Sequence, residues 1–211
     1  MKLIAILLML LPVVAGAVDI ELGTGTAHFK KNQDGLWYQE GFPYSEDLKT
    51  TPLSIGLSHK FGNYRALIEY LDLGQVFMSA LATHDYLYAP GQPGNCVGDC
   101  PLYRFVGNGN VKGFVLSAAR DVSIFNIPFY VEGGIYTYKS TWREIVLDST
   151  TGTELIKINH EPRQEITPML GFGIRYSGLD IGVRWFQLES SGDASPALYN
   201  RAYTLMLKAY F

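Results

Sequence analysis

The four histidines are the residues of this sequence best suited to acid–base catalysis, but their neighbours do not complete a catalytic site. A serine hydrolase needs a nucleophile, a histidine base within hydrogen-bond reach, and a third group that orients the base. Ser58 and His59 are adjacent, so in a strand their side chains point to opposite faces. His84–Asp85 and His160–Glu161 have no serine at a suitable spacing. We therefore predict no catalytic residues and a protein that is not an enzyme.

Two cysteines, Cys96 and Cys100, enclose a short segment with Gly98 at its centre. Two cysteines this close in an exported loop usually form a disulfide, and the glycine lets the ring turn tightly. The alternative is a metal site made of both thiolates and Asp99, but no histidine or third cysteine is close in sequence. We expect a disulfide that stabilises its own loop, no metal and no cofactor.

The first seventeen residues have the composition of a secretory signal peptide. Lys2 gives a basic start, residues 3–14 are almost wholly apolar, and Ala15-Gly16-Ala17 offers a small-residue cleavage site. The alternative is a membrane anchor, but the run is short and has no basic stop-transfer flank. We predict a signal peptide at 1–17 and one mature domain at 18–211.

The composition of the mature segment limits its partners and its fold class. Without Lys2, 16 basic residues face 20 acidic ones, and no basic block occurs, so we expect no nucleic-acid partner. Twenty-two glycines and fourteen tyrosines in so short a chain favour an all-β, aromatic-rich architecture.

The final residues, 201–211, alternate between apolar and mixed side chains with a period of two, which indicates a strand. The apolar row continues to the last residue, where a lone Phe211 beside a free carboxylate would gain little in a soluble core. This row consists of Tyr203, Leu205, Leu207, Ala209 and Phe211.

Seven further segments show the same alternation, and the connections between them are alternately long and short. The eight predicted strands lie at about 18–30, 51–61, 64–73, 110–120, 129–138, 169–176, 179–186 and 203–211. An additional hairpin is expected over 142–163, with its turn at residues 148–152. An even strand number, with short turns on one side and long loops on the other, is typical of a transmembrane barrel.

The row opposite the apolar one is charged and rich in glycine. It contains Asp19, Glu21, Arg65, Glu69, Glu132, Arg175, Asp180, Arg184 and Lys208. Five acids and four bases can pair inside a narrow lumen, whereas buried charges without partners would be costly. We therefore place the apolar row outside and the charged row inside. A soluble lipocalin-like barrel, with the apolar row inside, is the alternative; it would leave the terminal Phe211 unexplained, and the Gly-x-Trp of this chain, Gly35-Leu36-Trp37, follows the first predicted strand instead of opening it.

The chain resembles the small outer-membrane barrel families: the membrane domain of OmpA-type proteins, the OmpX-like proteins and the opacity-type porin-like proteins. The resemblance rests on the signal peptide, the glycine-rich segment 168–176 and the alternation from Tyr203 to Phe211. It implies an eight-stranded antiparallel transmembrane barrel in the bacterial outer membrane, with the terminal alternating row as a signal for the barrel-assembly machinery. No segment follows the barrel, so we expect no peptidoglycan-binding domain.

This architecture leaves three functional classes open. Eight strands enclose a space just wide enough for side chains, so we expect a plug of ion pairs rather than a small-solute or ion channel. Some barrels of this kind modify lipids, but the catalytic set is missing. Aromatic residues expected in loops, Trp37, Tyr38, Phe42, Tyr44, Tyr86, Tyr88 and Trp142, could form an adhesive surface, pack loop on loop or rest among lipid headgroups. We predict a monomer with a structural or surface-interaction role, in contact with outer-membrane lipid and lipopolysaccharide and with an unknown surface ligand.

Overall fold

The computed structural model describes residues 18–31, 41–83, 101–125, 127–159, 162–188 and 199–211. These residues form β1 (Val18–Lys31), β2 (Tyr44–Asp47), β3 (Lys49–Thr50), β4 (Leu53–Phe61), β5 (Tyr64–Ala82), β6 (Tyr103–Ile124), β7 (Ile127–Asp148), β8 (Glu154–Asn159), β9 (Arg163–Tyr176), β10 (Leu179–Gln187) and β11 (Tyr199–Tyr210). The described part of the chain holds no helix long and apolar enough to cross a membrane. The predicted signal peptide and disulfide lie outside the described residues and stay predictions.

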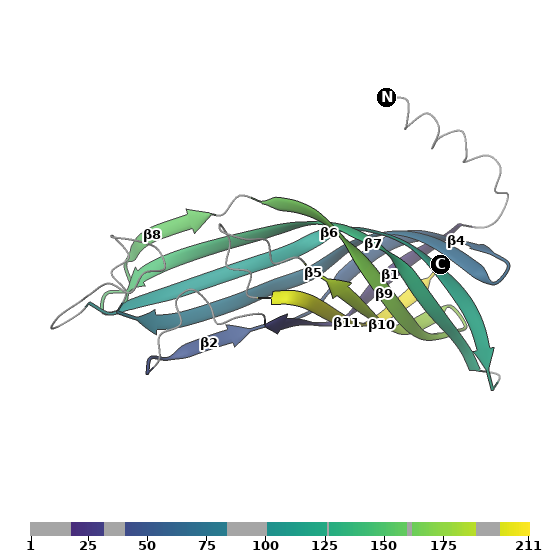
Figure 1. Ribbon diagram of the computed structural model, residues 1–211, viewed down its shortest axis with the longest axis horizontal. Helices are drawn as coiled ribbons and strands as arrows, with labels where there is room; N and C mark the ends of the chain where they lie inside the picture. The colour runs from purple at the N-terminus through teal and green to yellow at the C-terminus, as the bar shows by residue number, and fades with distance from the viewer. Residues whose placement is uncertain (1–17, 32–40, 84–100, 126, 160–161, 189–198) are drawn as a thin grey trace, which may run out of the picture.

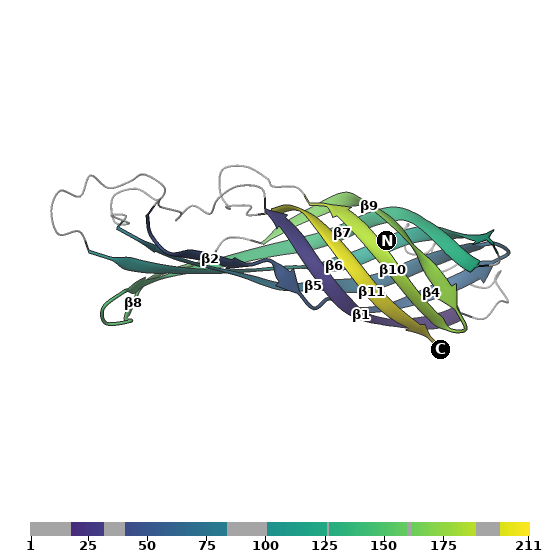
Figure 2. The ribbon, with the colours of Figure 1, turned by 90° about the horizontal axis from the view of Figure 1, so that it is seen from below.

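Eight of these strands close into an antiparallel barrel, as the sequence predicts. Their order is β11-β10-β9-β7-β6-β5-β4-β1, and β1 pairs back onto β11 from Glu21–Tyr210 to Lys31–Tyr199. At the seam the backbones of Ile20 and Phe211 exchange two hydrogen bonds, of 3.0 and 3.1 Å. Figures 1 and 2 show the ring at one end of an elongated molecule.

The two ends of the barrel differ. The short-turn end carries Val18, Phe211 and the short connections from β4 to β5, from β6 to β7 and from β9 to β10. At the long-loop end, β5, β6 and β7 continue beyond the other strands as an extended sheet, with β2 paired to β5 and β8 paired to β7 (Figure 2). The predicted hairpin over 142–163 is confirmed as β7 and β8, with its turn at Asp148–Gly152.

The predicted bounds of the third and fourth strands were wrong at the long-loop end. We predicted a connection from about 74 to 108, but β5 continues to Ala82 and β6 begins at Tyr103. A bulge at Gly74 explains the error in the third strand, because the cross-strand pairing jumps from Asp72–Lys112 to Gln75–Asn110 and resets the period of two in β5. Gly74 has a φ of 88°, and its N–H donates to Asp72 Oδ1 at 2.8 Å.

The turn between β7 and β8 depends on a carboxylate. Asp148 Oδ1 accepts hydrogen bonds from the backbone N–H groups of Thr151 at 2.7 Å and Thr150 at 2.8 Å. These bonds favour the charged carboxylate and hold the pKa of Asp148 below its ordinary value.

We predict that the β7–β8 turn loosens in acid. Because the pKa of Asp148 is lowered in the folded state, its stabilisation is present above the ordinary aspartate pKa and is lost as the pH falls through the lowered value. NMR titration of the Thr150 and Thr151 amides should report this change. Asp148→Asn keeps an acceptor oxygen and should remove the pH dependence; an unchanged titration in that variant would contradict the assignment.

Candidate functional site: a filled lumen inside an apolar belt

The centre of the lumen in the short-turn half is occupied by Arg184, which joins carboxylates from two other strands. Its Nε and Nη2 donate to the two oxygens of Glu132 at 2.9 and 2.7 Å, and its Nη1 donates to Glu69. Lys208 Nζ lies 2.8 Å from Glu69 Oε1 and 3.5 Å from Glu21 Oε2. All five groups are buried, so each charge has an opposite charge in place of water.

Glycines on neighbouring strands make room for these long side chains. Gly171 pairs with both Glu132 and Arg184, and Gly56 pairs with Glu69. A Cβ atom on Gly171 would lie 3.0 Å from Arg184 Cγ and 3.2 Å from Glu132 Oε2. The glycine-rich row therefore provides the space in which the bridge between Arg184 and Glu132 forms.

A second layer of charges lies nearer the short-turn end. Arg175 contacts Asp180 at 2.8 Å and Asp121 at 2.5 Å. Arg65 contacts Glu21 at 3.4 Å and Asp19 at 3.5 Å. Ion pairs join seven of the nine sequence-predicted lumen residues into one set, namely Asp19, Glu21, Arg65, Glu69, Glu132, Arg184 and Lys208. Arg175 and Asp180 form a second set with Asp121, and Tyr210 contacts both sets.

The sequence reasoning missed several partners of these two sets. Asp121 has the inward parity of Ala119, but the predicted strand stopped at 120. Ser117 Oγ donates to Glu132 Oε1 at 2.5 Å. Tyr130 lies with its ring 4.8 Å from the Arg175 guanidinium, and the Tyr210 ring lies 4.4 Å from that of Arg65. The period of two assigns Ser117, Tyr130 and Tyr210 to the inner row, but only the closed ring shows which charged side chains they contact.

Above the charges the interior is apolar, which departs from the polar inner row that we predicted. The Tyr136 ring packs 5.1 Å from Tyr138 and 5.2 Å from Phe186, and its hydroxyl donates to Leu71 O at 3.1 Å. Met169 and other apolar side chains fill the space around them. The interior changes from charged to apolar because the inward-facing residues beyond the short-turn half of each strand are apolar.

The apolar interior continues into the extended sheet, where Trp142 corrects a second prediction. We predicted Trp142 as a loop residue that could be adhesive, pack loop on loop or rest among headgroups; it is instead a buried residue of β7, and its Nε1 donates to Glu144 at 2.7 Å. Its ring covers Gly107 and Gly109 of β6; a Cβ on Gly107 would lie 2.6 Å from the ring. Tyr44 also packs against this core and Phe42 is half-buried, while Trp37, Tyr38, Tyr86 and Tyr88 lie outside the described residues.

The two layers leave little space inside the barrel. The cavity among the charges, lined by Arg65, Glu132 and Arg184 among others, measures about 10 Å³, which is at the lower limit for a single water molecule. In the described part of the chain, the interior around these charges is therefore filled by side chains.

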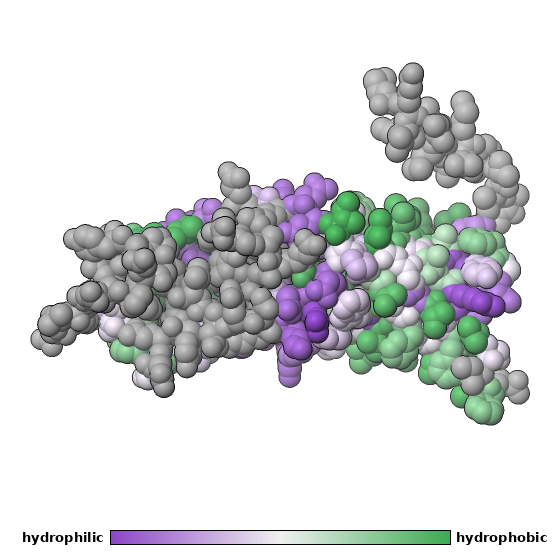
Figure 3. Space-filling model, in the orientation of Figure 1, coloured by the Kyte–Doolittle hydropathy of each residue, from purple (hydrophilic) through white to green (hydrophobic). Residues whose placement is uncertain are grey.

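The outer surface of the short-turn half is a belt of exposed apolar side chains (Figure 3). Leu53 is 61% exposed, Phe172 61% and Ile181 58%. The terminal row that we predicted as an assembly signal lies on this belt: Tyr203, Leu205, Leu207 and Phe211 are exposed, and Ala209 is half-exposed. Aromatic residues Tyr64 and Tyr176 lie toward its short-turn edge.

At its other edge the belt gives way to polar residues. On β1 the outward row changes from Val18, Ile20 and Leu22 to Thr24, Thr26, His28 and Lys30, while the inward row changes from Asp19 and Glu21 to Ala27 and Phe29. Polar and apolar faces are thus exchanged along the strand. Among the described residues, no group of three His, Cys, Asp or Glu side chains could hold a metal ion.

Comparisons with known proteins give weak similarities to solved structures. No family model matches the chain, and no curated protein matches it. The chain is similar to Neisserial surface protein A at 13% identity, covering 92% of this chain and 95% of that chain, with a TM-score of 0.37. It is also similar to Ail, the attachment invasion locus protein of Yersinia pestis, solved with the heparin analogue sucrose octasulfate (11% identity, 93% and 99% covered, TM-score 0.42).

A third similarity is to the translocator domain of the autotransporter NalP from Neisseria meningitidis, at 13% identity, with 100% and 94% of the two chains covered and a TM-score of 0.27. The closed strand pairing of this chain defines its fold independently of these similarities. The ring of eight strands is the architecture of the small outer-membrane barrels that the sequence resembles.

We predict that Arg184→Ala destabilises the barrel strongly. The substitution leaves Glu132 buried without its main partner and removes one of the two cations at Glu69, and breaking a buried pair costs about 3–5 kcal/mol. Urea unfolding in detergent or lipid would measure the loss. Lys60→Ala is the control, because its 3.6 Å pair with Asp121 is exposed and should contribute less than about 1 kcal/mol. Equal losses in both variants would contradict the central role of Arg184.

Proposed function

We propose that this chain is an outer-membrane β-barrel with a sealed lumen, and that it acts through the sheet it holds outside the membrane. The observation that carries the proposal is strand length. A tilted strand of about 9–11 residues spans a bilayer, yet β6 and β7 each have 22 residues. The additional residues serve no purpose in spanning, and they form an ordered sheet with its own buried core.

Membrane insertion is supported by the distribution of apolar side chains. Large exposed residues surround the short-turn half, while charged side chains are buried inside it. In water this arrangement would expose far more apolar surface than a soluble monomer normally does. In a bilayer, the closed ring satisfies the backbone hydrogen bonds and the belt contacts lipid. A soluble lipocalin-like barrel would have the opposite arrangement.

The orientation follows from the connections. Transmembrane barrels of bacteria have short turns on the periplasmic side and longer loops outside. We therefore place Val18, Phe211 and the tight turns in the periplasm, and the extended sheet of β2, β5, β6, β7 and β8 at the cell surface. The exposed terminal row on β11 is the surface that we propose the assembly machinery recognises.

A surface role fits the filled interior better than transport does. Arg184 and Lys208 neutralise the charges of Glu69 and Glu132, and the Tyr136–Phe186 layer covers them toward the long-loop end. A channel would need both layers to move. The extended sheet offers a partner a rigid, preformed surface.

The location can be tested by labelling one introduced cysteine at each end, in a chain whose Cys96 and Cys100 are replaced by serine. Lys157 on β8 and Lys60 on β4 are both exposed. Lys157→Cys should react with a membrane-impermeant maleimide in intact cells, and Lys60→Cys only after the outer membrane is permeabilised. Equal labelling of both in intact cells, or recovery of the chain in the soluble fraction, would refute the proposal.

Because the lumen is sealed, we predict that the inserted protein does not conduct ions. The chain without residues 1–17, folded and inserted into a planar bilayer, should give no discrete conductance steps, because charged and apolar layers both block the interior. Insertion is checked by protease protection in vesicles of the same lipid. Stepwise conductance by the inserted protein would refute the sealed lumen and favour the channel.

A further inference from the structure

The outer face of β1 carries a furrow that runs along the strand through the belt. Its floor consists of Leu22, Thr24 and Thr26, and its walls are the larger side chains of β4 and β11. Thr24 pairs with Leu53 on one side and with Leu207 on the other, and Thr26 pairs with Leu205. Because each threonine is smaller than its flanking leucines, the surface is hollowed over β1.

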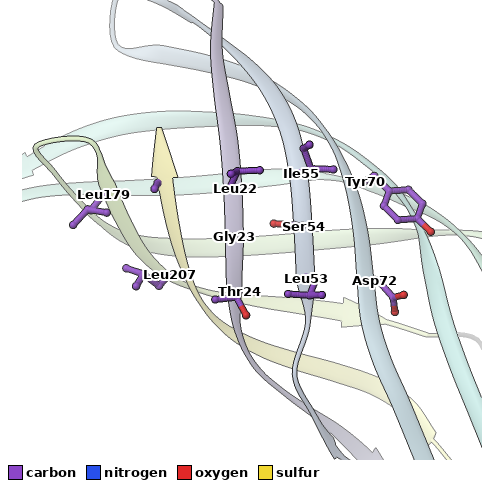
Figure 4. Close-up of a pocket in the computed structure, with 11 residues that line it drawn as sticks. Leu22, Gly23, Thr24, Leu53, Ser54, Ile55, Tyr70, Asp72, Leu179 and Leu207 are labelled. Atoms are coloured by element: carbon purple, nitrogen blue, oxygen red, sulfur yellow. The ribbon is translucent and has the colours of Figure 1, made fainter. Parts of the chain in front are cut away.

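The furrow has an apolar part and a polar part. The apolar part has a volume of about 620 Å³; Figure 4 shows Leu22 on β1, with Leu53 and Ile55 on one side and Leu207 on the other, and Asp72 also lines this part. The polar part follows it toward the long-loop end, has a volume of about 690 Å³, and is lined by Thr26, His28, Lys49 and Tyr203 among others. The order of the two parts matches the chain and the headgroup of a membrane lipid.

Basic side chains gather at the polar end of the furrow. His28 pairs across the strands with Lys49, and Lys30 pairs with Arg201, all on the outward face. Lys30 and Arg201 are like charges directly opposite each other, an arrangement that destabilises a sheet. The carboxylate of Asp47 lies beside Lys49, whose backbone N–H donates to its Oδ1 at 3.1 Å. The basic cluster consists of Lys30, Lys49 and Arg201 with His28 beside them, and its three cations outnumber this one carboxylate.

We propose that the furrow is a binding site for one phosphorylated glycolipid of the lipid A type, with an acyl chain over Thr24 and Thr26 and a phosphate held by Lys49 and Arg201. The inference deepens the proposed function and rests on its membrane orientation, which places the basic cluster in the outer leaflet. Lysine and arginine bind phosphate through charge-assisted hydrogen bonds. A zwitterionic phospholipid would bring an ammonium group to a site that is already cationic, so charge favours the glycolipid.

A matched pair of cations makes the test specific. Lys112 and Lys139 pair across β6 and β7 and are both exposed, but neither strand is next to β1, and Asp72 pairs with Lys112 on its other side. The proposed site depends on Lys49, which lines the polar part of the furrow, and on Arg201, which lies beyond that lining opposite Lys30, and not on these two lysines. General attraction of the belt edge to anionic lipid would depend on both pairs alike.

The experiment is native mass spectrometry of the folded chain in detergent, titrated with lipid A, phosphatidylglycerol or phosphatidylethanolamine. We expect one lipid A to bind in preference to both phospholipids. Lys49→Gln/Arg201→Gln should weaken lipid A binding about tenfold or more, the loss expected for one charge-assisted contact. Thr24→Phe fills the furrow on its lipid-facing side and should weaken it as well, while Lys112→Gln/Lys139→Gln should leave it unchanged.

Several results would overturn the inference: no binding of lipid A, equal binding of phosphatidylglycerol, or the same loss in both double variants. Circular dichroism and heat-dependent electrophoretic mobility confirm that each variant is folded. The labelling of Lys157→Cys and Lys60→Cys distinguishes failure of the membrane orientation from failure of the furrow site. If both cysteines label equally in intact cells, the membrane orientation is refuted. If labelling follows the expected pattern but lipid A does not bind, only the furrow site is refuted.

Discussion

The long strands of this barrel exchange their polar and apolar faces at the upper edge of the belt, and the other features depend on that exchange. Below the edge, apolar side chains face outward and charges face the lumen. Above it, Ala27, Phe29 and the residues around Trp142 turn apolar side chains inward, while Lys30 and its neighbours face outward. A strand whose apolar side chains stay on the same face throughout suits either lipid or water on its outer side, but not one after the other. The exchange allows one continuous strand to cross a membrane and then continue as an ordinary folded sheet.

The lower half shows how charges can be buried without a channel. Glu69 and Glu132 come from strands that are not neighbours in the ring, and Arg184 reaches both. The desolvation of such ions is large, so the network needs complete pairing rather than adding much net stability. Its value lies in specificity, because a shifted strand register would separate Arg184 from its carboxylates and leave them unpaired. Glycines such as Gly171 are part of the same solution, since they leave the volume that the guanidinium occupies.

The proposed functions assign a different task to each zone of the molecule. The filled lumen makes the barrel an anchor. The extension of β6 and β7 carries a sheet beyond the bilayer, where Trp142 and its glycine partners keep it ordered. The furrow over β1 lies between these zones, at the height where lipid headgroups meet the protein. A lipid fixed there would tie the barrel to its leaflet and leave the extended sheet free for a partner.

By itself, the sequence determined the barrel, the eight strands of its ring and the inner and outer rows of the predicted strand segments, because a period of two needs only local alternation and tight turns. Parity also assigned nine charged residues such as Arg184 to the inner row, although it missed Asp121. The tertiary structure alone decided which charges meet, since Arg184 and Glu69 are joined only by closure of the ring. It also decided where the strands end: the bulge at Gly74 breaks the alternation, so the sequence pattern stops at 73 while the hydrogen-bonded ladder continues to Ala82. The same limit hid Trp142 and Asp121, because a side chain's burial depends on the strand beside it and not on its neighbours in the chain.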